Sequence, residues 1–114
     1  MADQLGRLEQ LLLFALLRLE DGAYGAMIRQ EIEERAGRSL TAAAIHTTLR
    51  RLESRGFVRS HVGEPTPERG GKRKKHYRLQ PAGAEALARS WNTLSSLAED
   101  HVNRLRELAG EAES

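Results

Sequence analysis

The sequence predicts a mainly α-helical chain with one small β-hairpin. Apolar residues recur at helical spacing in three segments of the first half, residues 3–22, 26–37 and 41–56. Two short segments of alternating polarity follow, at residues 57–62 and 75–80. Three helices followed by a hairpin are the element order of a winged helix-turn-helix domain, and this is the fold that we expect.

The composition fits one small globular domain with an appended helix. The 114 residues include 39% hydrophobic and 30% charged side chains, a balance too apolar for a disordered chain. Only five residues are Phe, Trp or Tyr, so Leu and Ala must fill most of the core. Because so small a core is marginal, burial against a second copy would add stability.

Several classes of function are excluded by what the sequence lacks. It has no cysteine, which excludes disulfides and thiolate catalysis and fits the reducing cytoplasm. The four histidines lack metal-binding spacing, so we expect no metal site. No nucleotide-binding motif occurs and nothing positions a catalytic triad, so we expect neither a cofactor nor an enzyme. No apolar run reaches the length of a membrane span, and we therefore expect a cytoplasmic protein.

Positive charge is concentrated in the middle of the chain. The net charge is +2, but residues 38–80 contain eleven Arg and Lys against three Glu, or +8, which leaves −6 for the rest. A basic middle between acidic ends predicts a nucleic-acid face. An acidic protein would suit the same charge, so a dimeric winged-helix interaction subunit is the alternative function. Binding to random duplex DNA with a steep salt dependence would distinguish the two.

The first helix is apolar on more than one side. Leu13, Phe14 and Leu17 lie outside the main apolar stripe of residues 3–22. A helix that is apolar all round is usually buried on several faces. In so short a chain, we expect part of that cover to come from another subunit.

The second and third helices carry boundary signals. Gly37 suits a C-cap for the second helix. Thr41 suits an N-cap for the third helix, and Gly56 suits its terminator. These signals predict a short connection between the two helices, as a helix-turn-helix requires.

The outward face of the third helix has the composition of a DNA recognition helix. At about 100° per residue, Ile45, Leu49 and Leu52 face the core, and the opposite side is small and polar at first and basic further on. Small residues permit close approach to the major groove, Thr can contact a base edge, and Arg can bind guanine or phosphate. A solvated helix face also collects Arg and Thr, so the basic hairpin is needed to favour DNA. The candidate contacts are Thr41, Ala43, His46, Thr47, Arg50 and Arg51.

The hairpin connection carries a dense run of cations. Gly70 and Gly71 would let the chain turn and would place these cations on a wing that a phosphate backbone can reach. A charge run alone is more often a solvated surface, but Tyr77 and Leu79 indicate ordered chain directly after it. The candidate phosphate contacts are Arg69, Lys72, Arg73, Lys74 and Lys75.

The sequence predicts one helix that begins at Pro81, a residue that suits the first helical position, and runs almost to the end of the chain. Its apolar residues alternate at spacings of four and three, which is a heptad seam. We therefore expect a homodimer, with a winged domain at 1–80 (wing about 57–80) and a dimerisation helix at 81–114; packing on the chain's own domain is the alternative. The predicted interface residues are Leu87, Trp91, Leu94, Ala98, His101, Leu105 and Leu108.

The single tryptophan, Trp91, has small or polar neighbours along the seam, which leaves volume around its indole ring. Two indoles that face each other across a two-fold axis, with Phe14 of the partner nearby, would form a flat apolar slot. A planar aromatic ligand, particularly a cationic one, suits such a slot. A large side chain that simply anchors the interface is the alternative interpretation.

Three segments carry a family pattern. AAIHTTLRRLESRG supplies five residues of G-T-L-Y-P-x-L-x-R-L-E-x-x-G, namely Leu49, Arg51, Leu52, Glu53 and Gly56. GKRKKHYRLQPAG supplies six of G-R-P-R-K-Y-Y-x-L-T-x-x-G, namely Gly71, Lys74, Lys75, Tyr77, Leu79 and Gly83. YGAMI is similar to a G-Y-E-I element at the start of the second helix. The sequence thus resembles the PadR-like transcriptional regulators, in their smaller subtype with a single C-terminal helix.

The resemblance implies a dimeric regulator, usually a repressor, whose C-terminal helix forms the dimer. We accordingly expect a repressor that binds palindromic double-stranded DNA and is released by a small-molecule inducer. The sequence departs from the family at the start of the recognition helix and in the wing. Ala43, Ala44, His46 and Thr47 replace Gly, Thr, Tyr and Pro, and Arg73 replaces the wing proline.

Overall fold

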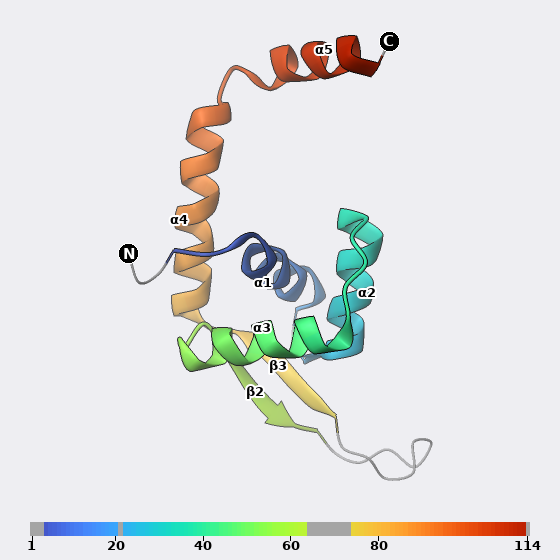
Figure 1. The fold of residues 1–114 in the computed structure, drawn as a ribbon. Helices are drawn as coiled ribbons and strands as arrows, with labels where there is room; N and C mark the ends of the chain where they lie inside the picture. Colours follow the sequence, from blue (N-terminus) through green and yellow to red (C-terminus); the bar gives the residue numbers. More distant parts are fainter. Residues whose placement is uncertain (1–3, 21, 64–73, 114) are drawn as a thin grey trace.

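A computed structural model of the chain describes residues 4–20, 22–63 and 74–113 (Figure 1). The helices are α1 (Arg7–Leu19), α2 (Gly25–Ala36), α3 (Ala42–Ser54), α4 (Pro81–Ala98) and α5 (Val102–Glu113). The strands are β1 (Ala23–Tyr24), β2 (Val58–Val62) and β3 (Lys75–Leu79). The first three helices and the sheet form one domain, from which α4 extends, and α5 leaves the far end of α4 (Figure 1). No helix in the described ranges combines the length and apolar character that crossing a bilayer requires.

Helix boundaries follow the predicted local chemistry. The Thr41 Oγ1 accepts a hydrogen bond from the Ala44 N–H at 3.0 Å, which caps α3. At the other end of α3, Gly56 takes the left-handed region with φ 78°, and the Phe57 N–H donates to the Leu52 carbonyl oxygen at 2.9 Å. This is the hydrogen-bond pattern of a Schellman motif. Two further boundary predictions are confirmed: Gly37 is the C-cap of α2, and Pro81 is the first residue of α4.

The predicted hairpin is confirmed, and it belongs to a three-stranded antiparallel sheet of order β1-β3-β2. Tyr77 in the central strand pairs with Ala23 of β1 and with Ser60 of β2. The β1 strand, which precedes α2, is not predicted by the sequence because two residues are too few to show a period. It ties the start of α2 to the wing.

The core is rich in leucine, as the low aromatic content predicts. The largest fully buried side chains come from α1, α2 and α3: Leu12, Leu13, Leu16, Ile28, Leu49 and Leu52. Phe14 and Leu17, on the other side of α1, are exposed in the single chain. Of the three residues outside the main apolar stripe of α1, Leu13 is buried within the chain, and only Phe14 and Leu17 are left uncovered.

The expectation of one continuous C-terminal helix is wrong. The α4 helix ends at Ala98, and Asp100 takes the left-handed region with φ 66° before α5 begins. A left-handed residue cannot continue the i→i−4 hydrogen-bond ladder, and Asp is among the residues that tolerate it best. Glu99 and Asp100 also place negative charge at a helix C-terminus, where the helix dipole disfavours it. The predicted heptad seam is thus divided between two helices.

Two interactions fix α3 against the hairpin. The Glu53 carboxylate accepts a hydrogen bond from the Ser60 Oγ at 2.5 Å and another from the Ser60 N–H at 3.3 Å. Tyr77 is buried beside them. Burial raises the pKa of the Tyr77 hydroxyl, the negative charge of Glu53 raises it further, and Arg50 partly opposes both. The phenol is therefore neutral at pH 7 and serves as a packing residue at the joint between helix and wing.

We expect loss of the Glu53–Ser60 contact to loosen this joint. Glu53→Ala should lower the free energy of unfolding by about 1–2 kcal/mol, because it removes hydrogen bonds to a half-buried carboxylate. In a Ser60→Ala background, the same change should cost about 1 kcal/mol less. Urea unfolding of the four proteins measures this coupling. If the stability losses of the two single variants add up to the loss in the double variant, the assigned contact is contradicted.

Gly83 is required by a close backbone approach at the start of α4. A Cβ atom at this position would lie 2.3 Å from the carbonyl oxygen of Phe57, which accepts the Gln80 N–H. Gly83→Ala should therefore lower the free energy of unfolding by about 1–3 kcal/mol in urea. Gly110→Ala is the matched control, because a Cβ there meets nothing within 4 Å. That control should leave stability unchanged or raise it by up to about 1 kcal/mol; similar losses in both variants would contradict the steric account.

Candidate nucleic-acid interface

The outward face of α3 lies on the surface, in agreement with the predicted helical rotation. Ile45, Leu49 and Leu52 are buried on the opposite side. Thr48 is buried as well, and its hydroxyl donates to the Ala44 carbonyl oxygen at 2.8 Å. All six candidate contact residues of this helix and its N-cap are exposed: Thr41, Ala43, His46, Thr47, Arg50 and Arg51. The exposed face is small and polar near its N-terminus and basic towards its C-terminus.

The base of the wing is held by side chains around β1. The Lys74 Nζ lies 3.8 Å from the centroid of the Tyr24 ring, a cation–π distance. The His76 Nδ1 donates to the carbonyl oxygen of Gly22, and its ring stacks on His61 with centroids 5.3 Å apart. These contacts join the turn before α2 to both strands of the hairpin. Sequence reasoning missed Tyr24 and His76, because the Tyr-Gly pair was assigned only to the helix start.

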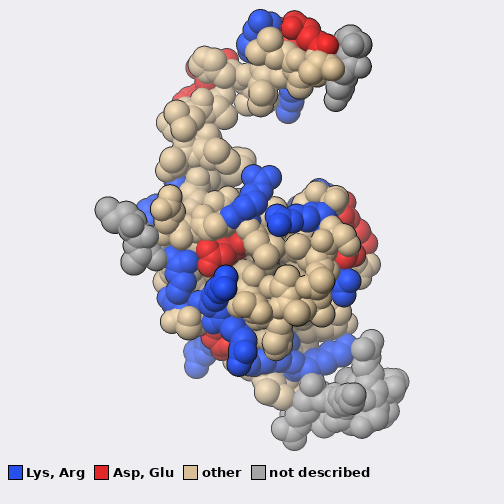
Figure 2. Space-filling view, in the orientation of Figure 1, with Lys and Arg blue, Asp and Glu red and all other residues tan. Residues whose placement is uncertain are grey.

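One hollow brings the predicted residues of the helix and the wing together. Tyr24, Gly25, His46, Lys74 and Lys75 are among the residues that line a volume of about 270 Å³. None of the described residues that line it is Asp or Glu. Figure 2 shows Lys and Arg gathered over the end of the molecule that carries α3 and the hairpin. The other three predicted wing contacts lie outside the described residues: Arg69, Lys72 and Arg73.

A second, apolar surface is formed by α1 and α4. Phe14 and Trp91 meet edge to face, with ring centroids 6.0 Å apart and an interplanar angle of 84°. Together with Leu17 and Leu87 they border a hollow of about 230 Å³. The sequence placed the Phe14 of a partner beside Trp91, but this contact lies within one chain because α1 packs on α4.

The predicted seam residues have different environments. Leu87 is only 4% exposed and packs in the core of its own chain, because the first half of α4 covers α1. It is therefore not available to a partner. Trp91 and Leu94 are 56% and 54% exposed. Of the remaining seam residues, Ala98 is half-buried and three are exposed: His101, Leu105 and Leu108.

Leu97 is the residue that the heptad pattern missed. It is 79% exposed, more than any other large apolar side chain that the structure describes. The pattern assigned the seam across α4 and α5 as if they were one helix, and Leu97 fell outside it. The sequence signal for Leu97 is its apolar side chain in the last turn of α4. This signal can be recognised only when the helix is known to end at Ala98.

The chain matches the family model described as the transcriptional regulator PadR-like family over residues 13–89. No curated protein sequence matches it significantly. Among solved structures, a PadR-like transcription factor from Bacteroides fragilis is 26% identical with a TM-score of 0.70, and the match covers 86% of this chain and 88% of that one. A PadR family transcriptional regulator from Eggerthella lenta is 28% identical with a TM-score of 0.67, over 89% and 85% of the two chains.

The Bacillus subtilis PadR in complex with operator DNA is similar in fold. It is 24% identical with a TM-score of 0.62, and the match covers 74% of this chain and 46% of that one. The family match spans more than half of the chain and includes α2, α3 and the whole sheet. Because the family consists of regulators of transcription, the expectation that the protein is not an enzyme is confirmed. The chain belongs to the PadR-like family of transcriptional regulators.

Proposed function

We propose that the protein is a homodimeric repressor that binds double-stranded DNA through α3 and the wing. The observation that carries this proposal is the hollow shared by His46, Lys74 and Lys75, beside the exposed face of α3. A phosphate at this position would meet two cations and no described carboxylate. The small, polar and basic side chains on the outward face of α3 would then lie towards the bases, as direct readout of a major groove requires.

The family and its relatives support DNA as the partner. The chain belongs to a family of transcriptional regulators, and the related Bacillus subtilis PadR is complexed with operator DNA. In a two-fold dimer, the two copies of α3 enter major grooves about one helical turn, or a multiple of it, apart. The operator is therefore palindromic.

Arg50 and Lys75 should affect DNA binding in different ways. Arg50→Ala should cost about 1–3 kcal/mol of binding free energy and relax preference at one position of the operator. Lys75→Ala should weaken binding to all sequences alike and reduce the slope of log K against log salt by about one. Fluorescence anisotropy on operator and random duplexes measures both effects. Arg104→Ala, on exposed α5, is the control, and Arg50→Ala binding like that control on both duplexes would contradict the assignment.

The homodimer is supported by apolar surface that the chain leaves uncovered. Large apolar side chains are exposed along α1, α4 and α5: Phe14, Leu17, Trp91, Leu94, Leu97, Val102, Leu105 and Leu108. A soluble protein rarely exposes so many large apolar side chains unless another surface covers them. Two copies that bury these faces against each other satisfy this requirement and supply the two recognition helices.

Leu94→Glu combined with Leu105→Glu should give a folded monomer at micromolar concentration. Both side chains are exposed in the single chain, so the new charges penalise association and not the domain fold. Asn92→Glu with Asn103→Glu adds the same charge at exposed polar positions and should remain dimeric. Sedimentation equilibrium gives the mass, and circular dichroism reports the fold. A double Leu variant that is fully dimeric would exclude this interface.

Repression is proposed to end when a planar aromatic molecule binds beside Trp91. The indole is half exposed, and the hollow that it borders with Phe14 is lined mostly by apolar side chains of α1 and α4. A flat ligand can stack on the free indole surface. Because α4 carries both this hollow and the surface proposed to dimerise, ligand and DNA would act on one shared equilibrium.

Trp91 provides its own probe for this ligand. It is the only tryptophan, so quenching of protein fluorescence reports on this position alone. Planar cationic dyes should quench it, and saturating operator DNA should weaken their binding. Trp91→Phe removes the signal, and competition with labelled DNA then shows whether the dye still acts. If operator DNA does not change the quenching by the dye, the hollow beside Trp91 has no role in regulation.

A further inference from the structure

The exposed face of α3 consists of a central stripe and two flanks. Ala43, Thr47 and Arg50 form the stripe, because they lie within about 60° of one another around the helix axis. All three are exposed, as are His46 on one flank and Arg51 on the other. A helix that lies in a major groove turns its central stripe towards the base edges and its flanks towards the two phosphate backbones. The stripe is therefore the part of α3 that can recognise a base sequence.

The two neighbouring threonines of α3 differ in the groups that they leave available. The Thr48 hydroxyl donates to the Ala44 carbonyl oxygen at 2.8 Å, and the Thr48 side chain is buried. Thr47 is exposed, and its hydroxyl has no hydrogen bond to any residue that the structure describes. Both the methyl group and the hydroxyl of Thr47 are therefore available to a base edge.

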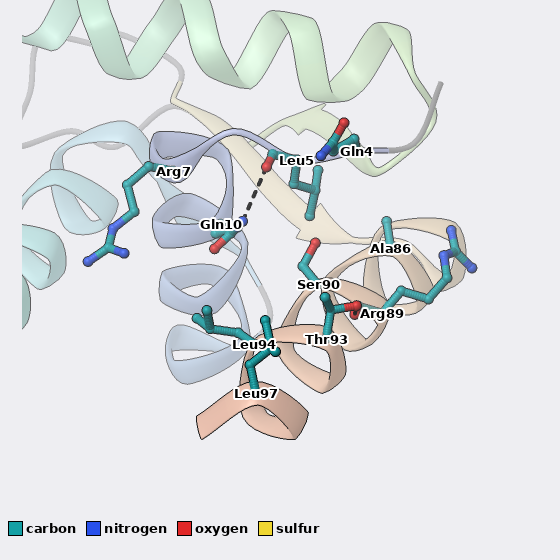
Figure 3. A pocket seen from close by; sticks show the side chains of 10 residues that line it. All are labelled: Gln4, Leu5, Arg7, Gln10, Ala86, Arg89, Ser90, Thr93, Leu94 and Leu97. Carbon is teal, nitrogen blue, oxygen red and sulfur yellow. Dashed lines mark hydrogen bonds between the residues drawn. The ribbon is translucent and has the colours of Figure 1, made fainter. Parts of the chain in front are cut away.

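The three arginines in the second half of α3 and at its end also differ. The Arg55 guanidinium donates to a Glu9 carboxylate oxygen at 3.2 Å and to the Gln4 carbonyl oxygen at 3.3 Å. Gln4 lines a groove of about 550 Å³ between the N-terminal segment and α4 (Figure 3). Arg55 thus anchors the end of α3 to the N-terminal segment. Arg50 and Arg51, in contrast, form no ion pair within the part of the chain that the structure describes, so their guanidinium groups are available to DNA.

We propose that Ala43 and Thr47 together contact the C5-methyl group of one thymine, and that Arg50 binds a guanine close to it. This inference rests on the proposed DNA binding and specifies the bases that each half-site presents to α3. Side chains four residues apart on a helix have Cβ atoms about 5–6 Å apart, a gap that one thymine methyl group can fill. The arginine fork matches the O6 and N7 acceptors of guanine.

The spacing of these residues along the helix sets the distance between the two bases. Thr47 and Arg50 are about 4.5 Å apart along the axis of α3, and base pairs follow one another about every 3.4 Å. The thymine and the guanine therefore lie within about two base pairs of each other in each half-site.

This base recognition is particular to this chain. Ala43 and Thr47 stand where the family pattern has Gly and Pro, and Arg50 stands at a position that the pattern leaves open. Glycine has no side-chain carbon, so the pair of methyl groups on the stripe is absent from the pattern. Arg51 matches an arginine of the pattern, and from its flank it contacts a phosphate whatever the base sequence. Sequence recognition by this protein thus depends on residues that differ from the pattern.

Modified bases test the thymine contact. The probe is a duplex with the inverted repeat that the full chain enriches from a random pool. Replacing the contacted thymine by deoxyuridine in one half-site removes only its methyl group, and should weaken binding about fourfold. Thr47→Ser removes the side-chain methyl group and keeps the hydroxyl, so its binding should respond less than about twofold to deoxyuridine. Thr47→Val keeps a methyl group at the same place, so the response should stay at about fourfold.

A second modified base tests the guanine contact on the same duplex. 7-Deazaguanine lacks the N7 acceptor, and at the contacted guanine it should weaken binding by the unsubstituted chain about tenfold. Arg51→Ala should keep this response and reduce the slope of log K against log salt by about one, because it removes a phosphate contact. Arg50→Ala should lose the response. Fluorescence anisotropy measures all of these affinities.

The outcomes separate this base recognition from DNA binding itself. A selected inverted repeat in which deoxyuridine has no effect at any thymine, or 7-deazaguanine at any guanine, would overturn the recognition and leave the proposed function intact. Responses that are unchanged in Thr47→Ser or in Arg50→Ala would overturn it as well, because other residues then make the contacts. A chain that binds no duplex at all would overturn the proposed function.

Discussion

The rigid joint between α3 and the hairpin is the constraint on which the rest of the structure depends. The two parts of the basic face are separated in sequence, and only packing can hold them in one orientation. Tyr77 fills the space under the joint, and the Glu53–Ser60 hydrogen bonds fix its edge. On the other side of the sheet, β1 ties the wing to the start of α2. The surface that carries Arg50 and Lys75 is thus built on strands and helices and not on loops.

The core of the single chain leaves large apolar side chains exposed on α1, α4 and α5. Leucines of α1 and α3 and isoleucines of α2 fill one compact interior, and the far side of α1 and the end of α4 remain exposed. The chain leaves these faces exposed and continues into α5, which has little to pack on in its own chain. In the proposed dimer, two copies bury this apolar surface against each other. The two-fold symmetry of that dimer implies an operator with two-fold symmetry.

Periodicity and capping predicted the domain well because both are local. The buried stripe of α3, the Thr41 cap and the hairpin each follow from a few adjacent residues. The remaining features depend on tertiary packing. The break at Asp100 has no Gly or Pro to mark it, so the heptad pattern ran through it. The burial of Leu87 and the pairing of Phe14 with Trp91 both follow from how α4 lies on α1, which no single segment specifies.

The central claim is that two recognition helices, related by a two-fold axis, read one stretch of DNA. Selection of bound sequences from a random duplex pool by the purified full chain tests it most directly. The account predicts enrichment of one inverted repeat, with half-site centres about 10 base pairs or a multiple apart, and affinity that falls steeply with salt. Enriched sequences without two-fold symmetry would contradict the dimeric reader, and a pool that shows no enrichment would contradict sequence-specific DNA binding by this protein.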